Sequence, residues 1–209
     1  MRPLNRPFTT ALTLFFALTL STSVLAEAKE ESKKPPLLKI GQIAPSFLLK
    51  TMNPKAGGLP IVSTKKLAGS TATDRRDAIV LSFGAWYCGP CKKELPELKV
   101  FAEKNKARGV LVAEVIIDKD PEQVELMRKF TIDELKVPFP VVHDRFGIVS
   151  RRYGATELPY TVVIDGERVV RWVHRGFTPD AMKLLQEAVD QVLATKSASP
   201  TPKSPTPTP

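Results

Sequence analysis

The chain has 209 residues, of which 43% are hydrophobic, and a formal net charge of +9 at pH 7. This length and composition suit one folded domain with a substantial core. Two arginines in residues 1–26 and two lysines in residues 196–209 account for +4 of the charge, and the rest is spread along the chain without a basic block. The pattern argues against nucleic acid as a partner and is compatible with acidic partners or a peripheral position near an anionic membrane.

Residues 1–26 have the layout of a secretory signal peptide. Arg2 and Arg6 give a positive start, residues 11–20 form an apolar run, and small residues lead to a cleavage point after Ala26. The run is shorter than the roughly 20 apolar residues that a membrane-spanning helix needs. We therefore expect an exported protein of the periplasm or cell envelope, soluble after cleavage or N-terminally anchored without it.

Two further segments are expected to lie outside the fold. Residues 27–38 form a linker with three lysines and three glutamates, and residues 196–209 form a tail of Pro, Ser, Thr, Lys and Ala. The tail contains no aliphatic residue larger than alanine, so it cannot bury enough apolar surface to fold. The folded domain is expected at residues 39–195.

Strand and helix patterns alternate in the first half of that domain. The runs 78–83 and 110–117 are rich in β-branched residues and predict buried strands, with apolar residues at helical spacing between them. Asp120 and Pro121 are typical of a helix start, and this helix is expected to continue through Leu135.

Five further elements are expected downstream: a strand at 138–142, a helix at 146–153 ended by Gly154, hairpin strands at 160–164 and 169–173, and a helix from Thr178. The order of elements predicts an α/β, three-layer fold with a central mixed sheet. The cysteine-containing loop then lies where the first strand meets its helix, at an edge where ligands commonly bind in α/β sheets.

Both cysteines lie in "GAWYCGPCKKELPEL", residues 84–98. A structural disulfide between Cys88 and Cys91 would close so small a loop that it contributes only about 2 kcal/mol. A zinc or copper site needs about four ligands, and besides the cysteines the chain offers only His143 and His174, 31 residues apart. A reactive pair accounts for more of the neighbouring residues, and neither a metal nor another cofactor is expected.

The residues after the first cysteine predict different roles for the two sulfurs. Gly89 and Pro90 supply a turn and a proline suited to a helix's first turn, which places Cys88 at the helix N-terminus. Backbone N–H groups and the helix dipole there favour a thiolate, so Cys88 is expected to attack a substrate disulfide. Cys91 is one turn further along and shielded, and it is expected to resolve the mixed disulfide.

Glu94 is three residues beyond Cys91 on the same side of the expected helix. No lysine or arginine stands three or four residues from it in either direction. We expect a partly buried carboxyl with a raised pKa that exchanges a proton with Cys91. The alternative is a surface glutamate with a partner from elsewhere in the fold.

Three motifs occur in a recognisable order: "GQIAPSFLL" (41–49), "CGPCKKELPEL" (88–98) and "YGATELPYTVVIDGERVVRWVHRG" (153–176). Together they resemble the thioredoxin superfamily, specifically its exported TlpA/ResA-like branch, which includes the cytochrome c maturation thioredoxins. The resemblance implies a thioredoxin-like fold, a cysteine pair that cycles between dithiol and disulfide, and a cis bond between Leu158 and Pro159 beside that pair.

What the resemblance implies about activity is a thiol-disulfide oxidoreductase that reduces disulfide-containing protein substrates, with electrons from a membrane thiol donor. The substrate is expected to bind over a surface made by Trp86, Tyr87, Gly89, Pro90, Leu158 and Pro159. No histidine lies between the cysteines to stabilise the thiolate strongly, which favours a reductase over an oxidase. The alternatives are a thiol peroxidase of the peroxiredoxin type and a non-catalytic copper or haem-protein chaperone that uses the cysteines and His143.

The chain departs from the family pattern near the cysteines. Tyr87 replaces the usual tryptophan, and Gly84 replaces a common bulky aromatic residue. Ser82 stands where cytoplasmic thioredoxins have a buried aspartate, which leaves Glu94 as the chief expected proton carrier.

Overall fold

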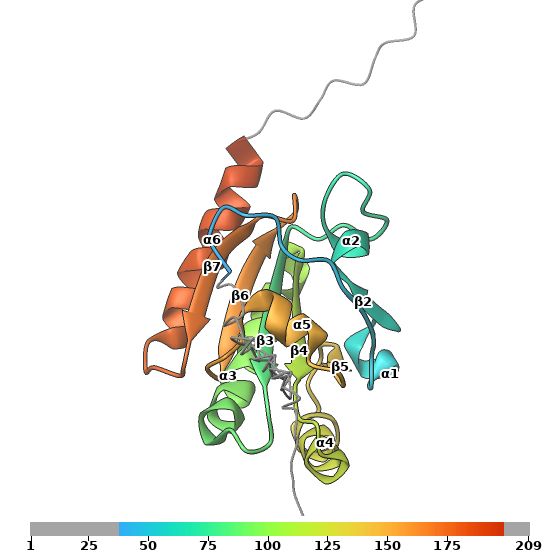
Figure 1. The fold of residues 1–209 in the computed structure, drawn as a ribbon. Helices are drawn as coiled ribbons and strands as arrows, with labels where there is room; N and C mark the ends of the chain where they lie inside the picture. Colours follow the sequence, from blue (N-terminus) through green and yellow to red (C-terminus); the bar gives the residue numbers. More distant parts are fainter. Residues whose placement is uncertain (1–37, 199–209) are drawn as a thin grey trace, which may run out of the picture. The chain divides into compact units, whose positions relative to one another are not determined.

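The structure is a computed structural model that describes residues 38–198. Its centre is a five-stranded sheet in the order β5-β4-β3-β6-β7 (Figure 1). The strands are β3 (Ala78–Gly84), β4 (Val110–Ile116), β5 (Val141–His143), β6 (Tyr160–Asp165) and β7 (Val170–Arg175). β3 pairs in parallel with β4, and β4 with β5, whereas β6 is antiparallel to both β3 and β7. The expected mixed sheet is confirmed.

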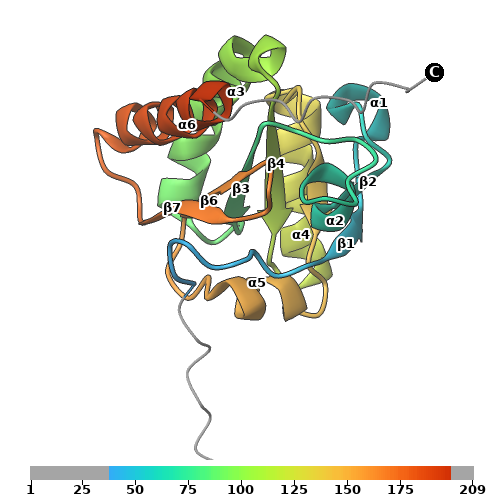
Figure 2. The same ribbon diagram turned by 90° about the horizontal axis from the view of Figure 1, so that it is seen from above.

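Helices cover both faces of this sheet and give the expected three layers (Figures 1 and 2). One face packs against α3 (Gly89–Asn105), α4 (Pro121–Arg128) and α6 (Ala181–Ala198). The other face packs against α5 (Ile148–Tyr153) through Val149 and Tyr153. Helices α3 and α6 lie side by side, and Leu98 of α3 and Leu185 of α6 belong to the same buried cluster.

The central strand β3 divides its side chains between the two layers. Ile79, Leu81 and Phe83 face the α5 layer, and Ala78 and Val80 face the α3 layer. Because side chains alternate along a strand, Ser82 and Gly84 also face the α3 layer. The end of β3 below α3 is therefore lined by small side chains.

Residues 48–67 form elements that the sequence analysis did not predict. They are β1 (Leu48–Lys50), α1 (Pro54–Gly57), β2 (Ile61–Ser63) and α2 (Thr64–Leu67), with β1 and β2 paired antiparallel. Such short elements leave too few residues for a periodic pattern. Asn53 anchors them, because its side-chain amide donates to the Phe139 carbonyl and accepts from the Val141 N–H, both at 2.9 Å.

The first expected motif lies against the last hairpin. The Gly41 N–H donates to the Val170 carbonyl and the Ala44 N–H to the Arg168 carbonyl, both at 2.8 Å. The Tyr153 hydroxyl also donates to the Pro45 carbonyl at 2.8 Å. This segment is thus part of the folded unit.

The helix expected from Asp120 to Leu135 begins where it was predicted, but it is a regular α-helix only as far as Arg128. The Asp120 carboxylate accepts from the N–H groups of Glu122 and Gln123, as an N-cap does. After α4 the chain continues as a π-helix, Lys129–Glu134. There the Thr131 hydroxyl donates to the Met127 carbonyl at 2.8 Å and competes with the regular backbone bonds.

Two other starting boundaries differ from expectation. The strand expected at 138–142 is β5, and it begins only after Pro140, which has no N–H to donate. α5 begins at Ile148 because the Asp144 carboxylate accepts the N–H groups of Ile148 and Ser150. A 3₁₀ turn, Lys106–Arg108, follows α3.

α6 runs to Ala198, past the expected domain end at residue 195. The expected signal peptide, the linker apart from Leu38, and the tail beyond Ala198 lie outside the described residues. Within residues 38–198, no helix has both the length and the apolarity that crossing a membrane requires.

Candidate active site

The cysteine loop joins the end of β3 to the start of α3. Cys88 is the N-cap of that helix, and its N–H bonds back to the Ala85 carbonyl at 3.0 Å. Its sulfur accepts the N–H of Cys91 at 3.1 Å. Both the helix N-terminus and this N–H favour negative charge on a reduced sulfur, and the thiolate itself stays a prediction.

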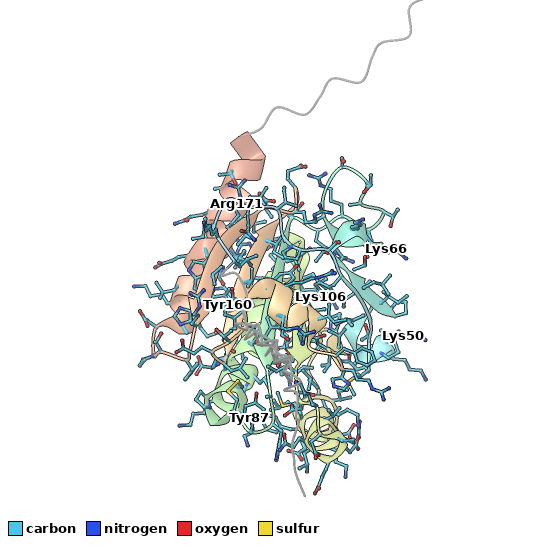
Figure 3. The ribbon with its side chains drawn as sticks, viewed as in Figure 1. Lys50, Lys66, Tyr87, Lys106, Tyr160 and Arg171 are labelled. Carbon is cyan, nitrogen blue, oxygen red and sulfur yellow. A yellow bond between two sulfur atoms is a disulfide. The ribbon has the colours of Figure 1, made fainter. Side chains whose placement is uncertain are left out.

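Cys88 and Cys91 are joined as a disulfide. Cys88 is 7% exposed and Cys91 is 1% exposed, so Cys88 is the more accessible sulfur although both are largely covered. The pair packs with Ala85, Ile117 and Leu158. Figure 3 shows this end of the domain, where Tyr87 is labelled beside a yellow sulfur–sulfur bond.

The bond between Leu158 and Pro159 is cis, as the resemblance implied. Leu158 packs against the cysteine cluster and Pro159 is buried. The Pro159 carbonyl already accepts the N–H of Gly176 at 2.8 Å. An extended substrate segment would therefore pair with backbone groups on the Leu158 side.

The expected binding surface is only partly assembled. Gly89 and Pro90 are exposed beside Cys88, and Tyr87 is 64% exposed. Trp86, which we expected over the mixed disulfide, instead packs against Phe130 at 6.4 Å between ring centroids and lies under the Lys92 ammonium at 4.0 Å. Its ring belongs to the α3–α4 layer, whereas Tyr87 faces solvent.

Glu94 is 1% exposed, which is deeper than the partial burial expected. Its carboxyl accepts from the Thr161 hydroxyl at 3.1 Å and from the Ser82 hydroxyl at 3.3 Å. Burial raises the pKa of Glu94 from an ordinary 4.5 to about 7, against the lowering effect of these two hydrogen bonds. The alternative of a surface ion pair is wrong.

Glu114 is a buried acid that the sequence analysis missed. In the sheet, Ser82 pairs with Glu114 on one side and with Thr161 on the other, so the three side chains form one row below Glu94. Glu114 is 1% exposed, and its pKa is well above the ordinary range because of burial and the neighbouring charge of Glu94. A glutamate inside the apolar run 110–117 was the available signal.

Asp118 ties the end of β4 to the cysteine loop. Its two carboxylate oxygens accept the Trp86 N–H at 3.1 and 2.9 Å, and His143 Nε2 lies 2.9 Å from the Asp118 carbonyl. Among the described residues, no group of three or more His, Cys, Asp and Glu side chains is arranged to hold a metal ion. His143 and His174 therefore do not form a metal site with the two cysteines in the described part of the chain.

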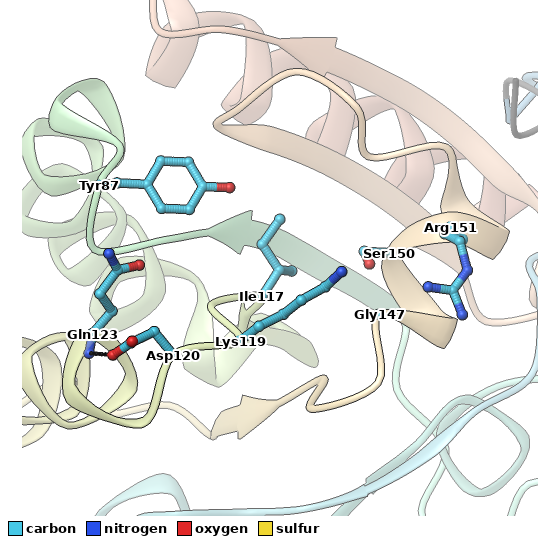
Figure 4. Close-up of a pocket in the computed structure, with 8 residues that line it drawn as sticks. All are labelled: Tyr87, Ile117, Lys119, Asp120, Gln123, Gly147, Ser150 and Arg151. Carbon is cyan, nitrogen blue, oxygen red and sulfur yellow. Dashed lines mark hydrogen bonds between the residues drawn. The ribbon is translucent and has the colours of Figure 1, made fainter.

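A cleft of about 460 Å³ opens beside the cysteine loop (Figure 4). Its lining residues are Tyr87, Ile117, Lys119, Asp120, Gln123, Gly147, Ser150 and Arg151. Ile117 connects it to the disulfide, because the same side chain packs against the two cysteines. The cleft can therefore hold residues next to a substrate cysteine.

Comparisons with known proteins agree with this geometry. The family model described as AhpC/TSA family matches residues 40–173. The chain is 27% identical over 169 residues to a protein of Oceanobacillus iheyensis named thiol-disulfide oxidoreductase ResA, which covers 81% of this chain and 80% of that protein. It is 28% identical over 145 residues to thioredoxin-like protein YneN of Bacillus subtilis, over 69% and 76% of the two chains.

Solved structures give the same result for the fold. A Chlorobium tepidum structure, provisionally assigned as a thiol:disulfide interchange protein DsbE, matches with a TM-score of 0.62 and 28% identity over 75% of this chain and 99% of that chain. The thioredoxin-like fold is thereby confirmed. The individual roles of Cys88, Cys91 and Glu94 stay predictions.

Glu94→Gln is expected to remove a pH dependence of stability. Because the Glu94 pKa is higher in the folded protein than its ordinary value, the fold binds this proton more tightly, and stability falls as pH rises from 4.5 to about 7. The difference corresponds to about 3 kcal/mol. Urea unfolding of the oxidised protein is measured at pH 5 and pH 8. Between these pH values the free energy of unfolding should fall by about 3 kcal/mol less in the variant than in the wild type.

Glu103→Gln is the matched control, since Glu103 is an exposed residue of the same helix. It should lose stability with pH as the wild type does. Equal losses in wild type and Glu94→Gln would contradict the raised pKa.

Proposed function

Because this chain belongs to the AhpC/TSA family and is a thiol-disulfide oxidoreductase of the ResA/DsbE type, we propose that it reduces disulfides of proteins outside the cytoplasm. The observation that carries the chemistry is the Cys88–Cys91 disulfide at the start of α3, with the Cys88 sulfur accepting the Cys91 N–H. Reduction of this bond gives one stabilised thiolate and one shielded thiol.

The cycle transfers two electrons. In the reduced protein the Cys88 thiolate attacks one sulfur of a substrate disulfide, forms a mixed disulfide and releases the other sulfur as a thiolate. Cys91 then loses its proton, and its thiolate attacks the Cys88 sulfur. This step forms the Cys88–Cys91 disulfide and releases the second substrate sulfur, so the protein dithiol is oxidised and the substrate disulfide is reduced.

Two features support the reductive direction. A strongly stabilised thiolate makes a dithiol protein an oxidant, because its reduced form is favoured. Here Gly89 and Pro90 separate the cysteines and bring no cationic group to the sulfur. The buried Glu94, with a pKa of about 7, supplies a base for the buried Cys91 thiol.

The direction is tested by the reduction potential and by trapping. Equilibration with a dithiothreitol redox buffer should give a potential nearer the roughly −270 mV of a thioredoxin than the roughly −120 mV of a strong oxidant. Cys91→Ser should accumulate mixed disulfides through Cys88, and Cys88→Ser should form none. A potential near the oxidant's value, with the oxidised protein converting dithiol peptides to disulfides, would reverse the proposed direction.

A thiol peroxidase is the second candidate, because the matching family is described as AhpC/TSA. In that activity peroxide would oxidise Cys88 to a sulfenic acid, and Cys91 would displace water to form the same disulfide. Measuring hydrogen peroxide consumption in the presence of a thiol reductant distinguishes a peroxidase from a protein-disulfide reductase. Peroxide turnover much faster than reduction of a protein disulfide would favour the peroxidase.

The proposed location and electron source follow from the leader-like residues 1–26. A reductase in an oxidising compartment must be reduced again, and a membrane protein with a dithiol on the outer side would supply the electrons. In intact cells expressing the full chain, a membrane-impermeant maleimide should label Cys88 of the Cys91→Ser variant after mild reduction. Labelling only after lysis would contradict export.

The cleft next to Cys88 supports a preference among protein substrates. Figure 4 shows Tyr87 at one end of the cleft, with Lys119 reaching past Ile117 toward Ser150 and Arg151. The Asp120 carboxylate is occupied as the cap of α4. The two cations therefore favour a substrate segment with an acidic residue near its cysteine.

A double variant, Lys119→Glu with Arg151→Glu, is expected to slow reduction of a disulfide peptide carrying aspartate beside its cysteine by about tenfold at low salt. When lysine replaces aspartate in the peptide, the double variant should reduce it at least as fast as the wild type does. Lys65→Glu with Lys66→Glu makes the same change of net charge on the exposed face of α2 and is the control. Equal slowing of both peptides would contradict a charge-selective cleft.

A further inference from the structure

Glu114 is a buried carboxyl that the cycle above leaves without a role. It is 1% exposed, and neither of its carboxyl oxygens accepts a hydrogen bond of good geometry among the described residues. The nearby Ser82 hydroxyl is the one donor that opposes the rise of its pKa. A buried polar group without partners destabilises a fold by roughly 1–3 kcal/mol. Its neighbours on the same face of β4 are apolar, so a leucine or valine there would continue the core.

The sheet brings Glu114 to Glu94 through Ser82. Ser82 pairs with Glu114 in the parallel β3–β4 ladder, and its side chain lies on the same face. The Ser82 hydroxyl donates to Glu94 Oε2 at 3.3 Å. The Glu114 carboxyl therefore comes from the sheet and the Glu94 carboxyl from α3, and both lie next to Ser82.

The absence of a side chain at Gly84 opens a path from Glu114 to Cys91. A Cβ at residue 84 would stand 2.5 Å from Glu114 Oε1 and 3.5 Å from Cys91 Cβ. Glu114 Oε1 and Cys91 Cβ are therefore no more than about 6 Å apart, on either side of the same empty position. A larger residue at 84 would separate them.

The groups that face the two carboxyls are mostly acidic or uncharged. Glu97 on α3 and Asp118 after β4 are the further charged neighbours, Thr161 on β6 donates a hydrogen bond, and the Met127 methyl group of α4 lies 3.5 Å from the same empty position. Every charged side chain that shifts the pKa of either carboxyl is acidic and raises it. Two negative charges in this site would repel each other, so the pair retains a proton.

We propose that Glu114 and Glu94 act as one coupled carboxyl pair that holds the proton of Cys91, with Glu114 facing Cys91 across the gap at Gly84. The inference rests on the proposed dithiol cycle and adds a second acid to it. In this arrangement Glu114 is a positioning residue, because it acts on the proton that Glu94 and Cys91 exchange.

The proposed cycle moves one proton between the carboxyl pair and Cys91. In the oxidised protein below neutral pH the pair carries two protons and no charge. In re-reduction a donor thiolate attacks Cys88 and forms a mixed disulfide, and the Cys91 thiolate that leaves takes one proton from the pair, which keeps the other. A second donor thiolate then releases Cys88. During substrate reduction the Cys91 thiol returns that proton, and the resulting thiolate forms the disulfide.

The coupling is tested first by titration, without any substrate. In oxidised protein labelled with ¹³C at the glutamate side-chain carboxyls, we expect two coupled steps, one near neutral pH and one well above it. Glu94→Gln should leave Glu114 titrating at a lower pH than the upper step, because a like charge has been removed. An upper step that Glu94→Gln does not move would show that the two carboxyls are independent and overturn the proposal.

The functional test uses the reaction of the reduced protein with 5,5′-dithiobis(2-nitrobenzoate). Cys88 releases one thionitrobenzoate in a first phase, and Cys91 displaces the second after losing its proton. At pH 7, Glu114→Gln and Glu94→Gln should each slow the second phase by about tenfold and leave the first unchanged. The double variant should be no slower than the slower single variant, because the pair acts as a unit.

Two further variants complete the design. Gly84→Ala keeps both carboxyls but fills the gap, and it should also slow the second phase, which keeps the test decisive if Glu114→Gln folds poorly. Glu103→Gln on the exposed side of α3 should behave as the wild type. A second phase unaffected by both Glu114→Gln and Gly84→Ala, or singles whose effects multiply in the double variant, would overturn the proposal. Because this reagent needs only the dithiol, a wrong direction of the cycle would leave these results unchanged.

Discussion

The placement of α3 over the end of β3 is the contact on which the rest of the site depends. Cys88 caps the helix, so its sulfur accepts the Cys91 N–H, and one turn later the helix presents Cys91 to the core. One further turn brings Glu94 above the sheet, where Ser82 and Thr161 donate to it. A different angle between helix and strand would separate Cys88 from Glu94.

The fold bears a cost in stability at this point. The α3 face of the sheet is otherwise apolar, with Val80 and Val112 preceding Ser82 and Glu114 along their strands. Two carboxyls below a helix replace side chains that would contribute to the hydrophobic core, and one of them accepts no hydrogen bond of good geometry in the described residues. Such local violations of packing rules concentrate at functional sites, where the rest of the structure over-determines the geometry.

Local patterns in the sequence were enough to predict much of this structure. Asp120 as an N-cap, the hairpin turn after β6 and Cys88 at the start of a helix are each determined by residues within one turn of the chain. Partial burial of Glu94 could be anticipated because no cation stands three or four residues from it on its own helix. The central sheet followed from long β-branched runs, which are the strongest signals that a single sequence contains.

What could not be predicted depends on residues far apart in the chain. The meeting of Glu114 with Glu94 requires the alignment of β3 with β4 and β6, and no local pattern determines that alignment. Trp86 was expected beside the substrate, but its backbone N–H is held by Asp118, and its ring turns toward Phe130. The short elements between residues 48 and 67 have too few residues to repeat any period.

The π-helix at Lys129–Glu134 limits where this protein can change in length. A π turn holds one residue more than a regular α-helical turn. Deleting one residue of the regular helix α4, before this turn, would rotate the side chains that follow by about 100°. A deletion just before Phe130 would carry its ring away from Trp86 and leave the cysteine loop without support on that side. Insertions and deletions should therefore be tolerated far better in the exposed loop before β3 than in this helix.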